Sequence, residues 1–441
     1  MKKVLHIGKI FIKKNDSKLF NGSVKLCSEI TMLLNEKKLK KVCYFEFDSK
    51  YERFLCYENS DAFVIGLLIT AMENGLDIEF ETPLSEKLYY QLTNYYIPML
   101  SKYNRNYSLH CINLIGKTNN FYFKNEAVAT GCSGGVDSFY TIAKHMNKNL
   151  GNFKLTHLVY SSSGTADIVQ DRIESTFKKN RELVRNICND CNLEFIDCFN
   201  NLNEFYKFPY EGFNMFFTTI FGSVAFAIQK LIKIYYCSSG APIENFNIDV
   251  SKTNGFDGSA IDIFTVLCMN NQNVSFYSSG VEKNRNEKIE YISEFKPAQK
   301  NLMVCGIEAY GGKIEKSINC SNCKKCLRTM FSLYAINKLE KFKNVFDVVD
   351  FKKNLNKKIA RVLYIDHSDF TKITIKKAKL NKVWIPKSSY FIGFFKYKPI
   401  AFLKKHFKNS KIARKIYYKL KLDIKVNGFR GSSYESFENT K

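Results

Sequence analysis

Apolar runs alternate with longer helical patterns through the middle of the chain. Residues 127–130 are apolar or β-branched, which favours a buried strand, and residues 139–146 are typical of the first turns of a helix. The same alternation gives expected strands at 155–160, 193–198, 234–237 and from 275, and expected helices at 172–189 and 213–232. This spacing predicts an α/β fold with a doubly wound, mostly parallel five-stranded sheet.

One of these segments has no charged residue across the eighteen positions 212–229, so a membrane span has to be considered. Asn214, Thr218, Thr219 and Ser223 interrupt its apolar character. Its position after an expected strand favours a helix buried between a sheet and another layer.

The 441 residues are enough for two or three domains, each with its own core. The first part of the chain mixes short apolar stretches with Lys- and Asn-rich connections and carries no catalytic pattern. We expect an N-terminal accessory α/β domain at 1–125, the alternating α/β domain at 126–300, a cysteine-rich metal-binding segment with a helix at 301–345, and a basic helical region at 346–441.

Composition favours a folded protein, since 45% of the residues are hydrophobic and 15% are aromatic. The fourteen cysteines are scattered, and Lys9, Lys13 and Lys14 interrupt any apolar signal region near the start. We therefore expect a reduced, cytoplasmic setting.

A glycine- and serine-rich loop joins the first of these strands to its helix. Gly131, Gly134 and Gly135 allow close approach of other groups to the backbone, and Ser133 and Ser138 add hydroxyl donors. Such a loop points backbone N–H groups and the positive end of the helix dipole at one place, which predicts a phosphate site. The alternative is a turn that merely links the strand to the helix.

The string SGGVDS at residues 133–138 resembles the pyrophosphate loop of the PP-loop (N-type) ATP pyrophosphatases, also called adenine nucleotide alpha hydrolases. It differs from the P-loop of kinases, because no Gly-Lys-Ser/Thr follows. The resemblance implies cleavage of ATP between the α- and β-phosphates and transfer of adenylate to a substrate oxygen. It implies phosphate binding by Ser133, Gly134, Gly135 and Ser138.

The resemblance also places Asp137 close to the Mg²⁺ that accompanies ATP, and we expect Ser133, Asp137 and Ser138 to be catalytic. Gly131 and Val136 complete the expected ATP-binding loop. In this family the end of the second strand holds adenine through backbone contacts, which implies residues near Tyr160 and Ser161.

In a parallel sheet, ligands bind at the carboxyl ends of the strands, so the loop and residues 161–164 and 238–240 should line one crevice. Arg285 and Lys288 stand at the start of a later expected helix. They are candidates for binding phosphate or a carboxylate substrate, and the alternative is solvated charge.

A cysteine cluster follows, with Cys320, Cys323 and Cys326 at CxxCxxC spacing and Cys305 upstream. Four soft ligands suit Zn²⁺, which is the metal that we expect. An iron–sulfur cluster is the competing assignment, and cysteines packed as small apolar residues are a third interpretation. Cys188 and Cys191 also form a CxxC, at an expected helix end, which we interpret as structural.

The loop, the single upstream cysteine and CxxCxxC followed by Leu327-Arg328 together resemble the 7-cyano-7-deazaguanine synthase branch of the PP-loop family over about residues 126–330. This resemblance implies zinc at the four cysteines and adenylation of a carboxylate before attack by ammonia. The first 125 residues and the basic tail are additional to that branch, and the Cys305–Cys320 spacing is longer than is usual there.

The formal charge of +25 is concentrated near the end, since residues 371–421 contain sixteen Lys or Arg and no Asp or Glu. Leu403, Phe407, Ile412, Ile416 and Leu420 recur at helical spacing, which predicts basic amphipathic helices. Such helices favour contact with the inner face of the membrane as a peripheral protein. RNA binding and a docked helix with a solvated face are the alternatives.

The leading hypothesis is therefore an ATP-dependent ligase-type enzyme, a homodimer, that adenylates a carboxylate or carbonyl oxygen of a small molecule. A nitrogen nucleophile such as ammonia then displaces AMP. The alternatives are a PP-loop tRNA-modifying enzyme of the thiolation or lysidine type and a non-catalytic zinc-containing nucleotide sensor.

Overall fold

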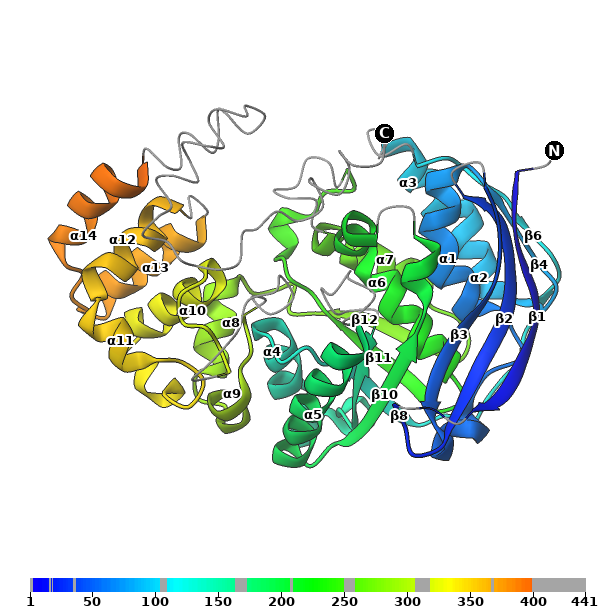
Figure 1. Cartoon of the computed structure of the whole chain (residues 1–441), viewed down its shortest axis with the longest axis horizontal. Helices are drawn as coiled ribbons and strands as arrows, with labels where there is room; N and C mark the ends of the chain where they lie inside the picture. Colours follow the sequence, from blue (N-terminus) through cyan, green and yellow to red (C-terminus); the bar gives the residue numbers. More distant parts are fainter. Residues whose placement is uncertain are drawn as a thin grey trace. The chain divides into compact units, whose positions relative to one another are not determined.

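A computed structural model describes residues 3–15, 17, 19–34, 37–103, 109–162, 173–206, 209–249, 258–305, 318–365 and 369–398 (Figure 1). The chain forms two compact units. The first unit comprises Met1–Ser133 and Asp137–Asn284, and the second comprises Gly134–Val136 and Arg285–Lys441.

A ten-stranded sheet runs through the first unit in the order β12-β11-β8-β9-β10-β3-β2-β1-β4-β6. Its parallel half is formed by β8 (Ala127–Gly131), β9 (His157–Ser161), β10 (Glu194–Asn200), β11 (Ile232–Ser238) and β12 (Ser275–Ser279). The predicted α/β class with a mostly parallel sheet is confirmed. The predicted number of five strands is wrong, because the sheet does not end at β10.

Residues 1–125 supply the other half of the sheet. An antiparallel meander contains β1 (Val4–Asn15), β2 (Ser23–Leu34) and β3 (Lys37–Asp48), and β4 (Asp77–Phe80) and β6 (Leu114–Ile115) continue it beside β1. β3 pairs antiparallel with β10 through Phe199 with Glu46 and Asn200 with Phe45. This pairing gives partners to backbone groups that would be unpaired at the edge of a five-stranded sheet.

Helices cover both faces of the parallel half (Figure 1). α4 (Val136–His145) and α5 (Ile173–Cys191) follow β8 and β9, whereas α6 (Pro209–Ala227) and α7 (Asp262–Met269) follow β10 and β11. The connections that contain α4 and α5 lead from β8 toward β10, whereas those that contain α6 and α7 lead back from β10 toward β12, in the opposite direction across the sheet. Right-handed crossovers therefore place the pairs on opposite faces.

The uncharged segment 212–229 lies largely in α6, and Val224–Ile228 are buried completely. α1 (Asp61–Asn74) packs on α6, and a Cβ at its Gly66 would stand 2.9 Å from Leu202 and 3.3 Å from Ser223 of α6. The prediction of a buried helix is confirmed. Among the residues that the structure describes, no helix has the length and apolar character needed to cross a membrane.

Shorter elements complete the first unit. They are α2 (Glu86–Gln91), α3 (Ile97–Tyr103), the paired strands β5 (Leu84–Ser85) and β7 (Thr118–Asn119), and the helical turns η1 (Ser49–Phe54), η2 (Leu92–Tyr96), η4 (Lys148–Phe153), η7 (Leu202–Phe205), η8 (Ile243–Asn245) and η10 (Gly258–Ala260).

The second unit is helical in its described part. Its elements are α8 (Arg285–Ile292), α9 (Lys296–Asn301), α10 (Lys324–Ala335), η12 (Leu339–Phe342), α11 (Val348–Lys353), α12 (Leu355–Ile365), α13 (Asp369–Leu380), α14 (Lys387–Ile392) and η13 (Gly393–Tyr397). α10 supplies much of the core through Leu327, Met330 and Phe331. The amphipathic helices expected from Leu403 to Leu420 lie outside the described residues.

A buried polar network ties residues 1–125 to the parallel half within the first unit. The carboxylate of Asp61, which is fully buried, accepts hydrogen bonds from the backbone N–H and hydroxyl of Ser85 at 2.9 and 2.6 Å. It also accepts bonds from the side-chain amides of Asn271 at 2.8 Å and Gln229 at 3.4 Å. Burial raises the pKa of Asp61, so these donors are needed to stabilise its ionised form.

Replacing Asp61 by alanine should therefore destabilise the first unit. Removing one acceptor leaves several buried donors unsatisfied, and we expect the free energy of unfolding to fall by about 3 kcal/mol. Urea unfolding followed by circular dichroism measures this change. The matched control is Asp190→Ala at an exposed position, where we expect a change below about 0.5 kcal/mol. Equal effects of the two substitutions would contradict the role given to Asp61.

Candidate functional site

The expected phosphate loop leaves the central strand of the parallel half. β8 pairs with β9 on one side and with β11 on the other, so the strand order reverses at β8. The Thr130 hydroxyl donates to the Tyr236 carbonyl at 2.8 Å, which links the carboxyl ends of β8 and β11. In parallel sheets, the carboxyl ends at such a reversal are where ligands bind.

The loop folds back over the first turn of α4. The backbone N–H of Cys132 donates to the Val159 carbonyl at 2.8 Å and extends the contact with β9. The backbone N–H of Ser133 donates to the Ser138 hydroxyl at 3.2 Å, and the two hydroxyl oxygens lie 3.0 Å apart. Gly134 has φ +71°, a conformation that favours glycine. The two serines are thus held together at the start of a helix.

The end of β9 is tied to β10. The Asn200 side-chain amide donates to the Ser161 hydroxyl at 3.0 Å, and its backbone N–H donates to the Ser162 hydroxyl at 2.9 Å. The Tyr160 ring stacks on Phe177 of α5 with centroids 5.3 Å apart. Since the ring of Tyr160 packs in the core, only the backbone of this residue matches the adenine contact implied above, which stays a prediction. Ser163 and Gly164 lie outside the described residues.

Arg285 and Lys288 lie in α8 of the second unit. Lys288 is only 1% exposed, so its interpretation as a solvated charge is wrong. A buried ammonium group requires hydrogen-bonding partners. Binding of phosphate or a carboxylate substrate by these two residues stays a prediction.

Contacts at the other end of α4 fix the helix against the segment that follows β12. Tyr140 and Lys144 donate to the carboxylate of Glu282, each at 2.6 Å. Partial burial raises the pKa of Glu282, but the hydrogen bonds from Lys144 and Tyr140 outweigh it and lower that pKa to about 2. The sequence reasoning missed this contact because the partners are far apart in the chain.

His145 is the last residue of α4, and the sequence pattern predicted no role for it. Its ring stacks on Tyr236 of β11 with centroids 3.7 Å apart, and Nε2 lies 3.1 Å from the Ser279 hydroxyl. Burial, with a contribution from Lys144, lowers the pKa of His145 to about 4. The neutral imidazole is therefore the form that the fold favours.

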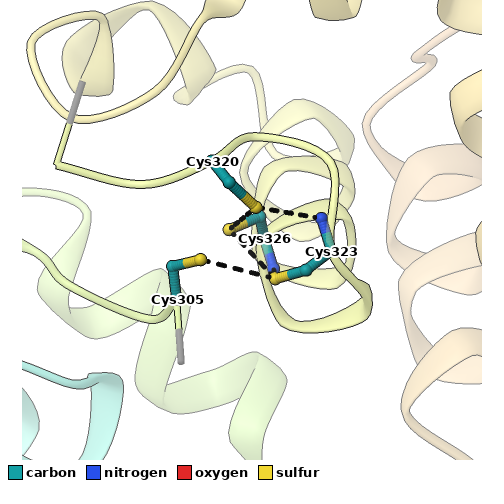
Figure 2. A group of neighbouring side chains, drawn as sticks. All are labelled: Cys305, Cys320, Cys323 and Cys326. Carbon is teal, nitrogen blue, oxygen red and sulfur yellow. Dashed lines mark hydrogen bonds between the residues drawn. The ribbon is translucent and has the colours of Figure 1, made fainter. Parts of the chain in front are cut away.

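The second unit gathers the four predicted cysteines, whose sulfur atoms all lie within 4.8 Å of one another (Figure 2). The Sγ–Sγ distances are 3.8 Å for Cys305–Cys323, 3.8 Å for Cys320–Cys326 and 3.4 Å for Cys323–Cys326. Four thiols arranged around one point can hold a metal ion. The predicted grouping of these cysteines is therefore confirmed.

The backbone around the cluster points toward the sulfur atoms. The N–H of Cys323 donates to Cys320 Sγ at 3.2 Å, and the N–H of Cys326 donates to Cys323 Sγ at 3.5 Å as α10 begins. Hydrogen bonds among the thiols lower the pKa of Cys320 and raise the pKa of Cys323 and Cys326, so a bound metal ion would have to displace protons from the latter two.

Asn319, which is fully buried, joins the two segments that carry the cysteines. Its side-chain oxygen accepts from the backbone N–H groups of Val304 and Cys305 at 2.8 and 3.1 Å. Its amide donates to the carbonyls of Leu302 and Val345 at 2.8 and 2.9 Å. Asn319 thus positions Cys305 next to the CxxCxxC turn. In the sequence, only its position directly before Cys320 indicates such a role.

Two basic residues of α12 hold the turn between Cys320 and Cys323. The Lys358 ammonium donates to the Ser321 carbonyl at 3.3 Å and to the side chain of Asn322. Arg361 donates to the Asn322 carbonyl at 2.9 Å. Nothing local in this lysine-rich sequence distinguished these two residues from solvated charges.

The cysteine segment also contacts the middle of the phosphate loop, which belongs to the same unit. The backbone N–H of Met303 donates to the Gly134 carbonyl at 2.7 Å, two residues before Cys305.

Comparison of the chain with protein-family models, curated proteins and solved structures found no match. The loop and the cysteine cluster are therefore the features from which function has to be inferred.

The cysteine cluster should bind one metal ion per chain. Replacing Cys323 and Cys326 together by alanine should remove that ion, because two ligands cannot retain an ion that four hold. Elemental analysis of the purified chain by mass spectrometry measures the metal content.

Cys188 and Cys191 provide a matched control, since they form a second CxxC pair and are both buried in α5. The variant Cys188→Ala/Cys191→Ala should keep the metal. Loss of metal from the control alone, or metal-free wild-type protein expressed with zinc and iron present, would contradict the site.

His145 should make the stability of the first unit depend on pH. Because its folded-state pKa is lowered, stability is complete above the unfolded-state value near 6.5 and is lost as the pH falls toward about 4. Between pH 7 and pH 5.5 we expect the wild type to lose about 1 kcal/mol more than His145→Gln. Urea unfolding at both pH values measures the difference, and equal losses in the two proteins would contradict it.

Proposed function

We propose that the protein is an ATP pyrophosphatase that adenylates a carboxylate or carbonyl oxygen of a small molecule and releases pyrophosphate. A nitrogen nucleophile such as ammonia then displaces AMP. The observation that carries this proposal is the SGGVDS loop, which joins the carboxyl end of the central strand β8 to the first turn of α4.

The loop suits the outer two phosphates of ATP. Backbone N–H groups at the start of α4 and the positive end of its dipole attract an anion. The hydroxyls of Ser133 and Ser138, 3.0 Å apart, can turn from each other to donate to phosphate oxygens. Asp137 in the first turn of α4 would hold the Mg²⁺ that accompanies ATP.

In this reaction the substrate oxygen attacks the α-phosphorus, and the bond from that phosphorus to the oxygen bridging it to the β-phosphorus breaks. Pyrophosphate leaves with the bond electrons, and the loop donors stabilise the charge that develops on it. Bound Mg²⁺ would add further charge stabilisation. The nitrogen nucleophile then attacks the activated carbon, and AMP leaves with the former substrate oxygen.

We propose Zn²⁺ as the ion of the cysteine cluster. A zinc ion bound tetrahedrally by sulfur atoms at about 2.3 Å separates those atoms by about 3.8 Å. Three of the Sγ–Sγ distances are 3.4 to 3.8 Å and none exceeds 4.8 Å, which fits one such ion, whereas a cluster of several irons would spread the four sulfurs farther apart. Four protein ligands leave no open position, so the role is structural.

Removing the Ser133 hydroxyl and the Asp137 carboxylate should abolish the release of AMP and pyrophosphate from ATP. Loss of one transition-state donor lowers the rate about 100- to 1000-fold, so the double variant Ser133→Ala/Asp137→Ala should lose at least that much. The assay incubates pure protein, Mg-ATP, ammonium and a small-molecule cell extract, and follows AMP and pyrophosphate by chromatography.

The control Ser101→Ala/Asp190→Ala carries the same substitutions in α3 and α5 and should keep the wild-type rate. Metal content of all three proteins should be equal, since the four cysteines are unchanged. Formation of ADP and phosphate instead of AMP, or an active loop variant, would overturn the proposal.

A further inference from the structure

Three phenylalanines near the end of the described chain form an exposed aromatic patch. Phe391, Phe394 and Phe395 of α14 and η13 are 67%, 49% and 63% exposed. The ring of Phe395 contacts the other two, with centroids 4.6 Å from Phe391 and 5.2 Å from Phe394. The three rings therefore form one apolar surface rather than scattered exposed residues.

The opposite side of the same helical segment is fixed to the second unit. Ser389, Gly393 and Tyr397 recur at four-residue spacing, and all three are buried. A Cβ on Gly393 would stand 2.0 Å from the Tyr364 ring of α12, so glycine allows the two helices to pack closely. This packing holds the aromatic patch in a fixed outward orientation.

Basic side chains accompany the patch. Lys398 lies over the Phe394 ring, with Nζ 4.4 Å from the centroid, and Lys387 is exposed one turn before Phe391. Residues 371–398 contain eight lysines and no acidic residue, and residues 399–421 add eight more Lys or Arg. Lys387, Lys396 and Lys398 are exposed within the helical segment that carries the phenylalanines, which favours an anionic partner.

We propose that the aromatic patch docks this protein on the surface of an anionic lipid bilayer. Apolar rings enter the headgroup region while lysines contact lipid phosphates, a combination typical of interfacial helices. RNA is favoured less, because bases stack on open ring faces and these rings contact one another. A second copy of this surface, or the basic segment that follows it, would bring like charges together.

Sedimentation of the full chain with vesicles tests the proposal. We expect binding to vesicles of phosphatidylcholine with 30% phosphatidylglycerol, at least tenfold weaker binding to phosphatidylcholine alone, and weaker binding as salt rises. The variant Phe391→Ser/Phe394→Ser/Phe395→Ser should bind anionic vesicles at least tenfold less. Lys387→Gln/Lys398→Gln should also bind less, by about fivefold for each lysine.

The matched control replaces exposed aromatic residues elsewhere in the chain. Tyr90, Tyr95 and Tyr122 are 55%, 47% and 76% exposed, and Tyr90 and Tyr95 also form a ring pair. Their triple serine variant should bind vesicles like the wild type, and all variants should keep the wild-type circular dichroism spectrum and melting temperature. Failure of the wild type to bind vesicles, or unchanged binding of the phenylalanine variant, would overturn the proposal. If the phenylalanine substitutions change the oligomeric state and the wild type leaves vesicles unbound, the patch is instead an interface between copies of this chain, which would also overturn the proposal.

A nucleic acid as the partner would give a different result. Wild-type protein would then bind a labelled RNA at physiological salt in a manner that depends on the three phenylalanines, and would leave vesicles unbound. That outcome would also overturn the proposal.

Discussion

The position of β8 in the middle of the parallel half constrains the candidate chemistry. Both edges of this strand are hydrogen-bonded, to β9 and β11, so the backbone of Ala127–Gly131 has little freedom to move. The Thr130 hydroxyl adds a bond to Tyr236 at the end of β11. The loop that follows is therefore anchored at its start by the sheet and at its end by α4. A short loop held in this way can keep its N–H groups aimed at a ligand before the ligand arrives, which lowers the reorganisation that binding requires.

The cysteine cluster shows how a small region without strands can be ordered. Asn319 makes four hydrogen bonds to backbone groups of two segments, residues 302–305 and Val345. Lys358 and Arg361 hold the turn between Cys320 and Cys323 through hydrogen bonds to Ser321 and Asn322. A metal ion held by the four thiols would add a further link to this arrangement. Within the same unit, the backbone N–H of Met303 donates to the Gly134 carbonyl.

Local signals explain what could be predicted from the sequence. The five parallel strands and the loop after β8 follow from apolar runs, glycines and serines within a few residues of one another, and the four cysteines follow from spacing. The pairing of β10 with β3 could not be predicted in the same way, because it joins segments far apart and only two residue pairs define it. The contacts of Glu282 with α4 and of Lys358 with the cysteine turn could not be predicted for the same reason, because they also join residues far apart in the chain. In a chain with 67 Lys or Arg, the sequence does not distinguish a lysine that makes structural hydrogen bonds from one that is exposed to solvent.

The junction between β3 and β10 has a consequence for how the chain is made. The meander β1–β3 leaves the ribosome before β10, the strand that covers the outer edge of β3, which is synthesised only after β8 and β9. Until then that edge can recruit strands from other molecules, which is a route to aggregation. A shortened chain that starts at β8 would expose the complementary edge on β10 permanently. The N-terminal segment thus acts as the covering strand of the parallel sheet, and neither half is a natural unit for separate expression.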